Sequence, residues 1–202
     1  MTTADHRIAG LDELMKAAAG DKLPPVESWN PEHCGDIGME IRADGTWFYQ
    51  GSPIGRQKLV KLFSRILRRE ADGSHVLVTP VEKVSVAVAD APFRAVEMEV
   101  RNPGPDQTLV FRTNVDDVVA VGADHPLSFA EEAVSGGLKP YVRVRGGLDA
   151  LVVRALYYDL AEMAAPRDGP EADNDNGNVE GLGVWSGGIW WPLKPDAAPT
   201  GS

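Results

Sequence analysis

The chain has little cysteine, no long apolar run and fewer basic than acidic residues, and each shortage excludes a class of protein. Its single cysteine, Cys34, cannot form an internal disulfide, and a zinc finger fails on the number of available ligands. No stretch of about 18 apolar residues is present to span a bilayer, and the N-terminus lacks the basic start and apolar centre of a signal peptide. We therefore expect a globular, cytoplasmic protein with no membrane partner.

The charge balance argues against a nucleic-acid partner. The formal net charge is −10 over 202 residues, which repels a polyphosphate backbone over most of the surface. One local exception is the stretch 56–69, which carries six cations. Such a basic face more often serves internal ion pairs or solubility than nucleic-acid binding. Nucleic acid is therefore not an expected partner.

A short motif occurs twice in the chain, at 46–69 and at 140–163. Each copy reads as an aromatic strand, a turn and an amphipathic helix, and an offset of 93 positions places Phe48 on Tyr141 and Phe63 on Leu156. The repeat predicts two related halves with a seam between them. A seam lined by polar groups is a common place for a ligand.

Local patterns predict the remaining elements. Asp44-Gly45 and Gly187-Gly188 each separate two extended runs and predict hairpins. Helical apolar spacing predicts helices over about 55–69 and about 148–164, and the alternating segment 75–121 predicts antiparallel strands. The fold class is therefore α+β, with two related halves that each contain antiparallel sheet and one main helix.

The domain organisation follows from these elements and from two polar segments. A short amphipathic helix is expected within 8–19, and the acidic segment 166–180 has almost no apolar content, so we expect a solvated loop there. The expected organisation is an N-terminal helical extension at 1–24, an N-terminal α+β domain at 25–97, a C-terminal α+β domain at 98–193 and a disordered tail at 194–202.

Long and unusual strings resemble a bacterial family of unknown function, the domain-of-unknown-function family 1285, from about Pro25 to Leu193. The resemblance implies a duplicated core, a C-terminal half loosely similar to a pleckstrin-homology-like fold, and a ligand site at the domain interface. It also implies a nucleotide-type ligand and a role in signal transduction. The acidic segment 166–180 departs from the family pattern as an insertion. The strings are WNPEHCGDIGMEIRADGTWFYQGSPIGR, VLVTPVEKV, DAPF, TNVDD, HPLSF, PYVRVRGGLDALVVRALYYDL and GVWSGGIWWPL.

The candidate ligand residues lie at the turns of the repeated units. A helix that begins near Arg56 would offer free N–H groups to an anion, and an arginine supplies a forked donor for phosphate or carboxylate. In the second copy two arginines lie two residues apart and so share one strand face. A turn capped for structural reasons is the competing interpretation. The candidates are Tyr49, Ser52, Arg56, Lys83, Arg143 and Arg145.

Other chemistry is weakly supported. His33-Cys34 suggests a thiol hydrolase, but sequence neighbours rarely have the geometry of a catalytic dyad. Asn114 with Asp116-Asp117 could bind a cation, although an Asx-type turn explains them better. No motif specifies a cofactor, a metal or a reaction. The expected function is the binding of an anionic, nucleotide-like small molecule without catalysis, with a protein-interaction module as the alternative and a hydrolase third.

The tryptophans of the last hairpin bear on that alternative. Trp185, Trp190 and Trp191 alternate unevenly, so at least one is expected to face outward or toward another segment. Aromatic residues dominate both protein cores and protein interfaces, and one could also stack on a base. Core packing or a subunit contact is the preferred interpretation of this hairpin.

Overall fold

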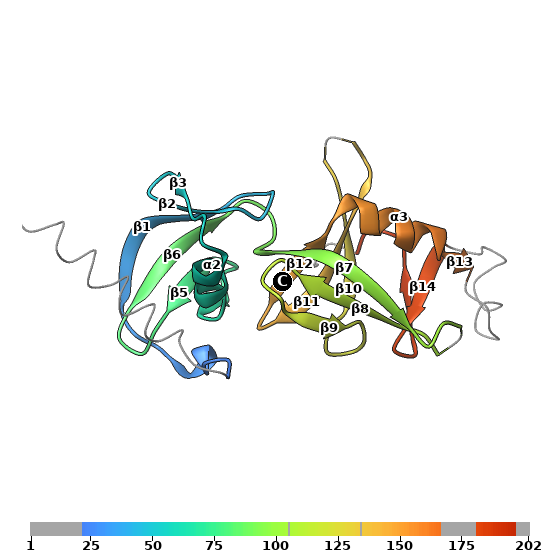
Figure 1. Cartoon of the computed structure of the whole chain (residues 1–202), viewed down its shortest axis with the longest axis horizontal. Coiled ribbons are helices and arrows are strands. Elements are labelled where there is room, and N and C mark those ends of the chain that lie inside the picture. Colours follow the sequence, from blue (N-terminus) through green and yellow to red (C-terminus); the bar gives the residue numbers. More distant parts are fainter. Residues whose placement is uncertain (1–21, 105, 134, 167–180, 197–202) are drawn as a thin grey trace, which may run out of the picture. The chain divides into compact units, whose positions relative to one another are not determined.

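The computed structural model describes residues 22–104, 106–133, 135–166 and 181–196 (Figure 1). The chain divides into two compact units, residues 1–93 with 146–148 and residues 94–145 with 149–202. Each unit is described below by itself. The helix expected within 8–19 lies outside the described residues, as do residues 167–180 of the loop expected at 166–180 and the last six residues of the tail.

The first unit is a six-stranded sheet with one α-helix. Its strand order is β3-β2-β1-β6-β5-β4, and neighbouring strands pair antiparallel except β1 and β6, which are parallel. The elements are the 3₁₀ turn η1 (Val26–Ser28), β1 (His33–Ile41), β2 (Trp47–Tyr49), β3 (Ser52–Pro53), α2 (Gln57–Ser64), β4 (Leu67–Arg69), β5 (His75–Val78) and β6 (Lys83–Val88).

The core of this unit forms where α2 packs on the sheet. Phe63 of α2 and Trp47 of β2 are each 1% exposed, and their rings stack with centroids 6.5 Å apart. Burial of two such large side chains contributes to the hydrophobic stabilisation of this unit. Ile66 and Leu77 are also fully buried there.

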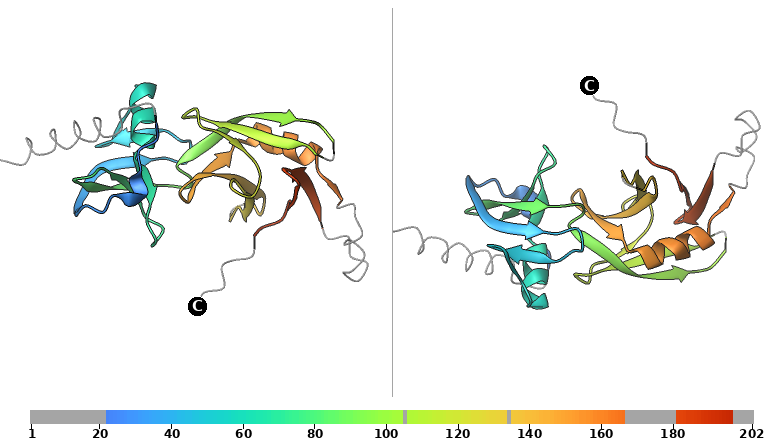
Figure 2. Two further views of the ribbon diagram at one scale, coloured as in Figure 1. Left: turned by 90° about the horizontal axis from the view of Figure 1, so that it is seen from below. Right: turned by 90° about the horizontal axis from the view of Figure 1, so that it is seen from above.

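The second unit is a six-stranded sheet followed by a helix and a small three-stranded sheet. The orders are β10-β11-β12-β7-β8-β9 and β13-β14-β15. The red hairpin of β14 and β15 can be followed in Figure 2. The elements are β7 (Phe93–Arg101), β8 (Thr108–Thr113), β9 (Val118–Ala120), β10 (Leu127–Glu131), β11 (Leu138–Arg145), β12 (Leu148–Val152), α3 (Arg154–Glu162), β13 (Ala165–Pro166), β14 (Leu182–Ser186) and β15 (Ile189–Pro192).

The two large sheets have the same strand order. When β7 to β12 are counted as first to sixth, both sheets read third-second-first-sixth-fifth-fourth. The helix differs in place, because α2 follows the third strand of its unit and α3 follows the sixth. An offset of 93 positions aligns β2 with residues 140–142 of β11, and it aligns α2 with residues 150–157, which span the end of β12 and the start of α3. The repeated motif therefore falls on different positions of the two strand orders. The described structure is sheet-rich and antiparallel-dominated, with two related halves and one main helix in each.

Both predicted helices are too long. The helix expected over 55–69 is α2 (Gln57–Ser64), and its last predicted residues form β4, which pairs with β5. The helix expected over 148–164 is α3 (Arg154–Glu162), and residues 148–152 are β12. Gly146 and Gly147 both have positive φ, as a two-residue hairpin turn requires, so the chain returns as a strand before the helix begins.

Both predicted hairpins are confirmed. β1 pairs antiparallel with β2 around Gly45, whose φ is +82°, and β14 pairs with β15 around Gly187 and Gly188 at φ +59° and +73°. Positive φ costs little at glycine, which is why these dipeptides mark the turns. Among the described residues, no helix is both long and apolar enough to cross a membrane.

Candidate functional site

A cleft of about 300 Å³ lies within the second unit, between α3 and the hairpin of β10 and β11. Figure 1 shows these two elements, with α3 in orange and the hairpin in yellow. This volume is at the lower end of the range of small-molecule sites. The lining residues are Arg94, Glu132, Ser135, Gly137, Leu138, Lys139, Pro140, Leu151, Val152, Arg154, Tyr157 and Tyr158.

The floor of the cleft is apolar because it is built from the ends of two strands. Leu151 and Val152 end β12 and are 8% and 3% exposed, and Pro140 on β11 is also buried. Val153 then leaves the strand with extended backbone, and α3 begins at Arg154. The chain therefore passes from buried apolar residues to an exposed cation within two positions.

The charged groups around the floor are mainly cationic. Arg94, Lys139 and Arg154 line the cleft against one carboxylate, that of Glu132. Asn114 binds both backbone polar groups of Arg94. The side-chain Oδ1 of Asn114 accepts a hydrogen bond from the backbone N–H of Arg94 at 3.0 Å, and the backbone N–H of Asn114 donates to the carbonyl of Arg94 at 2.8 Å. In a protein with a net charge of −10, this local excess of positive charge favours an anionic ligand.

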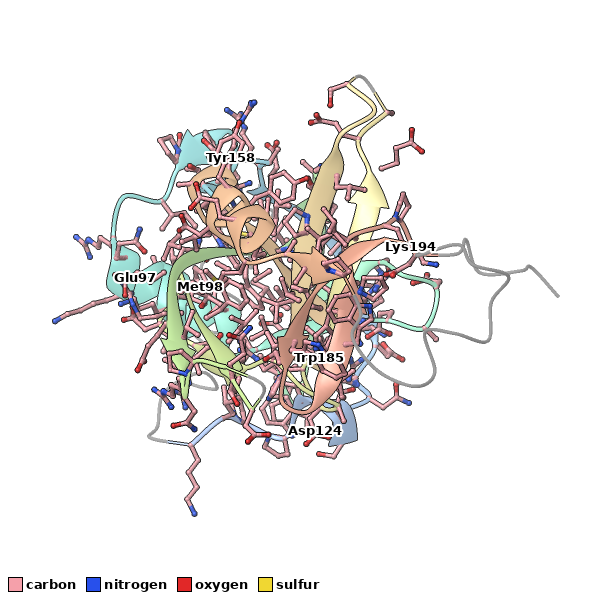
Figure 3. All side chains as sticks on the ribbon, turned by 90° about the vertical axis from the view of Figure 1, so that its right-hand side faces the viewer. Glu97, Met98, Asp124, Tyr158, Trp185 and Lys194 are labelled. Carbon is pink, nitrogen blue, oxygen red and sulfur yellow. The ribbon has the colours of Figure 1, made fainter. Side chains whose placement is uncertain are left out.

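The guanidinium of Arg154 is held by a tyrosine one turn further along α3. Its Nε donates a hydrogen bond to the hydroxyl of Tyr158 at 2.8 Å, and its guanidinium carbon lies 5.7 Å from the centre of that ring. This hydrogen bond, together with the field of Glu132, raises the pKa of Arg154 above its ordinary value. The side chain therefore stays charged and is restricted in orientation. Figure 3 labels Tyr158 on this helix.

The tyrosines also give the cleft an aromatic wall. Tyr157 is half-buried, whereas Tyr158 is 51% exposed, and their ring centroids lie 6.1 Å apart. A tyrosine ring offers an apolar face to a ligand and a polar edge to water. Cations, an aromatic wall and an apolar floor together suit a molecule with an acidic group and an apolar body.

The residues expected to bind a ligand in the first repeat lie on or beside one hairpin. Tyr49 and Ser52 are direct partners in the pairing of β2 with β3, and the hydroxyl of Tyr49 accepts a hydrogen bond from Gln50 Nε2 at 3.3 Å. Arg56 is exposed and occupies the N-cap position of α2. The structure thus brings Tyr49 and Ser52 together.

The other three expected residues are paired with carboxylates. Lys83 Nζ lies 3.1 Å from Glu70 Oε2. Arg143 pairs with Asp149, and Arg145 pairs with Asp117. Arg143 and Arg145 lie on one face of β11, as their spacing predicts. None of the six expected residues lines the cleft, and their role in binding stays a prediction.

The cleft residues were missed because they come from distant parts of the chain. Arg94 and Arg154 are sixty positions apart, and only the folded sheet places both at one cavity. One signal was available: Arg154 begins a segment, RALYYDL, whose two tyrosines follow it by three and four positions. In a helix this spacing places Tyr158 beside Arg154.

The residues weighed for catalysis or metal binding have other contacts. His33 Nε2 lies 2.8 Å from Ser85 Oγ, and Cys34 Sγ lies 3.6 Å from the carbonyl of Glu32. His33 and Cys34 are thus not hydrogen-bonded to each other in the structure. In the part of the chain that the structure describes, no three His, Cys, Asp or Glu residues are grouped to hold a metal ion.

Comparison with known proteins identifies two family models and two solved structures. The model described as "Domain of unknown function (DUF1285), N-terminal domain" matches residues 24–91, and "Protein of unknown function (DUF1285), C-terminal domain" matches residues 92–193. No curated protein matches the chain.

Both similar structures are of DUF1285 family proteins. The first, from Silicibacter pomeroyi DSS-3, is 43% identical over 92% of this chain and 95% of that chain, with a TM-score of 0.81. The second, from Shewanella baltica OS155, is 29% identical over 62% of this chain and 91% of that chain, with a TM-score of 0.49.

Proposed function

The chain belongs to the DUF1285 family. We propose that it binds a small anionic molecule with an apolar body in the cleft of its second unit. The observation that carries the proposal is the composition of the cleft wall. Arg94, Lys139 and Arg154 surround an apolar floor in a chain that is otherwise strongly acidic. Positively charged side chains beside an apolar, low-dielectric surface attract and retain an anion.

The sequence and the family resemblance also imply narrower properties, one of which is a different location for the ligand. A nucleotide-like ligand, a ligand seat between the two halves, a signalling role, a cytoplasmic location and a pleckstrin-homology-like second unit are implied by the sequence or by the family resemblance. Each stays a prediction. The cleft supports only the broader class of anionic small molecules.

A thermal-unfolding experiment on the full chain tests the proposal. Phenylacetate, adenosine monophosphate and inorganic phosphate are each added at low ionic strength, because salt weakens binding to exposed cations. A ligand at about 100 times its dissociation constant adds about 2.7 kcal/mol of stability, which raises Tm by roughly 5–10 °C for a protein of this size. We expect at least one of the two organic anions to give this shift.

Matched variants locate the binding site. Arg154→Gln is expected to abolish the shift and Lys139→Gln to reduce it. Arg101→Gln removes an exposed cation of the same unit outside the cleft and is expected to leave the shift unchanged. Loss of the shift in Arg145→Gln but not in Arg154→Gln would contradict the cleft and favour the residues expected from the sequence. Absence of any shift with the three probes would contradict the proposal itself.

A protein-interaction module is the second candidate, and the hairpin of β14 and β15 is the feature that favours it. β15 is an edge strand of its small sheet, and Trp190 and Trp191 on it are half-buried. These tryptophans also have internal roles: the ring of Trp190 covers Gly183, and Trp191 Nε1 donates to the carbonyl of Ser186 at 3.2 Å. The cleft is therefore the stronger candidate. A partner captured by the natural chain and lost in Trp190→Ala but retained in Arg154→Gln would reverse this order.

A further inference from the structure

The donors that Arg154 can offer to a ligand are limited by Tyr158. A guanidinium carries five N–H donors in a planar fork, and the Nε–H of Arg154 is already donated to the Tyr158 hydroxyl. Among the described residues, Arg154 has no ion pair with a carboxylate. Its two terminal nitrogens can therefore donate a pair of parallel hydrogen bonds, end-on, to two oxygens of one acid group.

The other two cations are less available. Arg94 and Lys139 each make another interaction within the structure. The ammonium of Lys139 also lies 6.0 Å from the centre of the Tyr141 ring. These two groups contribute a favourable field, and Arg154 is the residue suited to a direct paired hydrogen bond.

Glu132 limits the charge that a ligand can carry. Its carboxylate accepts a hydrogen bond from Ser135 Oγ, lines the same cleft and acts electrostatically on Arg154. A doubly charged acid group on the Arg154 fork would place its second negative charge in the field of this carboxylate. Like charges repel, and they repel more strongly beside an apolar floor than in water.

The rest of the cleft fits a flat apolar body. Leu138, Pro140, Leu151 and Val152 contribute apolar surface below the cations, and Tyr157 presents a half-buried ring beside them. Aromatic rings pack well against such a surface in offset or edge-to-face arrangements. The volume of about 300 Å³ restricts the occupant to a small molecule.

We infer that the ligand class is a small monocarboxylic acid with a flat apolar body, bound end-on by Arg154, and that Tyr158 is the positioning residue that sets this selectivity. This inference depends on the proposed function and deepens it. The Tyr158 hydroxyl holds Nε, so that the guanidinium presents its terminal nitrogens as a pair. Glu132 then disfavours acid groups with a second charge.

Three probes that share one benzyl group test the inference by calorimetric titration of the full chain at pH 8. They are phenylacetate with one negative charge, benzylphosphonate with up to two, and phenylacetamide with none. We expect phenylacetate to bind at least about tenfold more tightly than either of the others. Equal or tighter binding of benzylphosphonate, still dependent on Arg154, would overturn the carboxylate preference and leave the proposed function standing. Failure of all three to bind would overturn both.

Two conservative variants test the role of Tyr158. Tyr158→Phe keeps the ring and removes the hydroxyl, so we expect phenylacetate to bind about three- to tenfold more weakly and its preference over benzylphosphonate to shrink. Arg154→Lys keeps the charge without the fork and is expected to lose that preference. The selectivity ratio separates positioning from a general effect on folding. An unchanged ratio in Tyr158→Phe would overturn the positioning role.

Discussion

Arg68 and Glu70 form an ion pair at the end of β4, with Arg68 Nη2 2.6 Å from Glu70 Oε1. The side chain of Arg68 is only 8% exposed, and its Nη1 also donates to the carbonyls of Val26 and Trp29 at 2.7 and 2.6 Å. Glu70 in turn accepts a hydrogen bond from Lys83 at 3.1 Å. One buried guanidinium thus ties the segment 26–29 to the sheet of the first unit.

Glu70→Gln is expected to lower the free energy of unfolding by roughly 1–3 kcal/mol, because it leaves the buried Arg68 without a compensating charge. Urea unfolding at pH 7 measures the change. Glu99→Gln is the control, since Glu99 pairs with Arg101 on the surface and its loss is expected to cost less than about 1 kcal/mol. Equal effects of the two substitutions would contradict the account of Arg68 as a buried anchor.

The same pair predicts a pH dependence. Burial on its own raises the pKa of Glu70, but hydrogen bonds from Arg68 and Lys83 outweigh it and hold that pKa below the ordinary value of 4.5. A carboxyl whose pKa is lowered by folding contributes stability that is present above pH 4.5 and is lost as the pH falls through the folded pKa. The difference in unfolding free energy between the natural chain and Glu70→Gln should therefore shrink below pH 4.5. A difference that stays constant from pH 6 to pH 3 would contradict this assignment.

A buried hydroxyl joins the last hairpin to the larger sheet of its unit. Ser186 Oγ donates to the carbonyl of Val121 and accepts from the N–H of Leu109, both at 2.9 Å, and Ser186 is 0% exposed. Ser186→Ala leaves both backbone groups without this partner and is expected to cost roughly 1–3 kcal/mol. Ser52→Ala changes an exposed serine and is expected to stay within about 0.5 kcal/mol. Thermal and urea unfolding of both variants check the prediction, and a neutral Ser186→Ala would contradict it.

Gly183 packs directly against the Trp190 ring, and this contact predicts the effect of adding a methyl group at Gly183. A Cβ at Gly183 would lie 2.5 Å from Trp190 Cζ2 and 2.6 Å from the carbonyl oxygen of Trp191. Gly183→Ala is therefore expected to destabilise the protein by roughly 1–3 kcal/mol. It is also expected to change the wavelength of tryptophan emission, because the added methyl group displaces the Trp190 ring. Gly55→Ala is the control, because its Cβ meets nothing within 4 Å. Indistinguishable unfolding and emission for the two variants would contradict the close packing.

Some of the fold could be predicted because its signals are local. The dipeptides Asp44-Gly45 and Gly187-Gly188 mark hairpins through their tolerance of positive φ, which needs no knowledge of distant residues. The length of the helices could not be predicted in this way. Leu148, Leu151 and Val152 have helical spacing, yet the two preceding glycines turn the chain with positive φ, and pairing in the sheet makes these residues a strand.

The cleft depends still more on long-range structure. Arg154 and Tyr158 could be paired from their spacing in a helix, but their approach to Arg94 and Leu138 follows from strand order alone. The two arginines of β11 share one strand face, as their spacing predicts, and each is paired with a carboxylate there. Sequence alone could not show which cations have such partners.

The most direct test of the central claim is a titration of the isotope-labelled full chain with phenylacetate, followed by amide NMR. The account predicts chemical-shift changes that saturate together and concentrate at 138–140, 151–154 and 157–158, around the cleft. Changes confined to the surroundings of Arg56 or Arg145, or no saturable change at all, would contradict the assignment of an anion-binding cleft to the second unit.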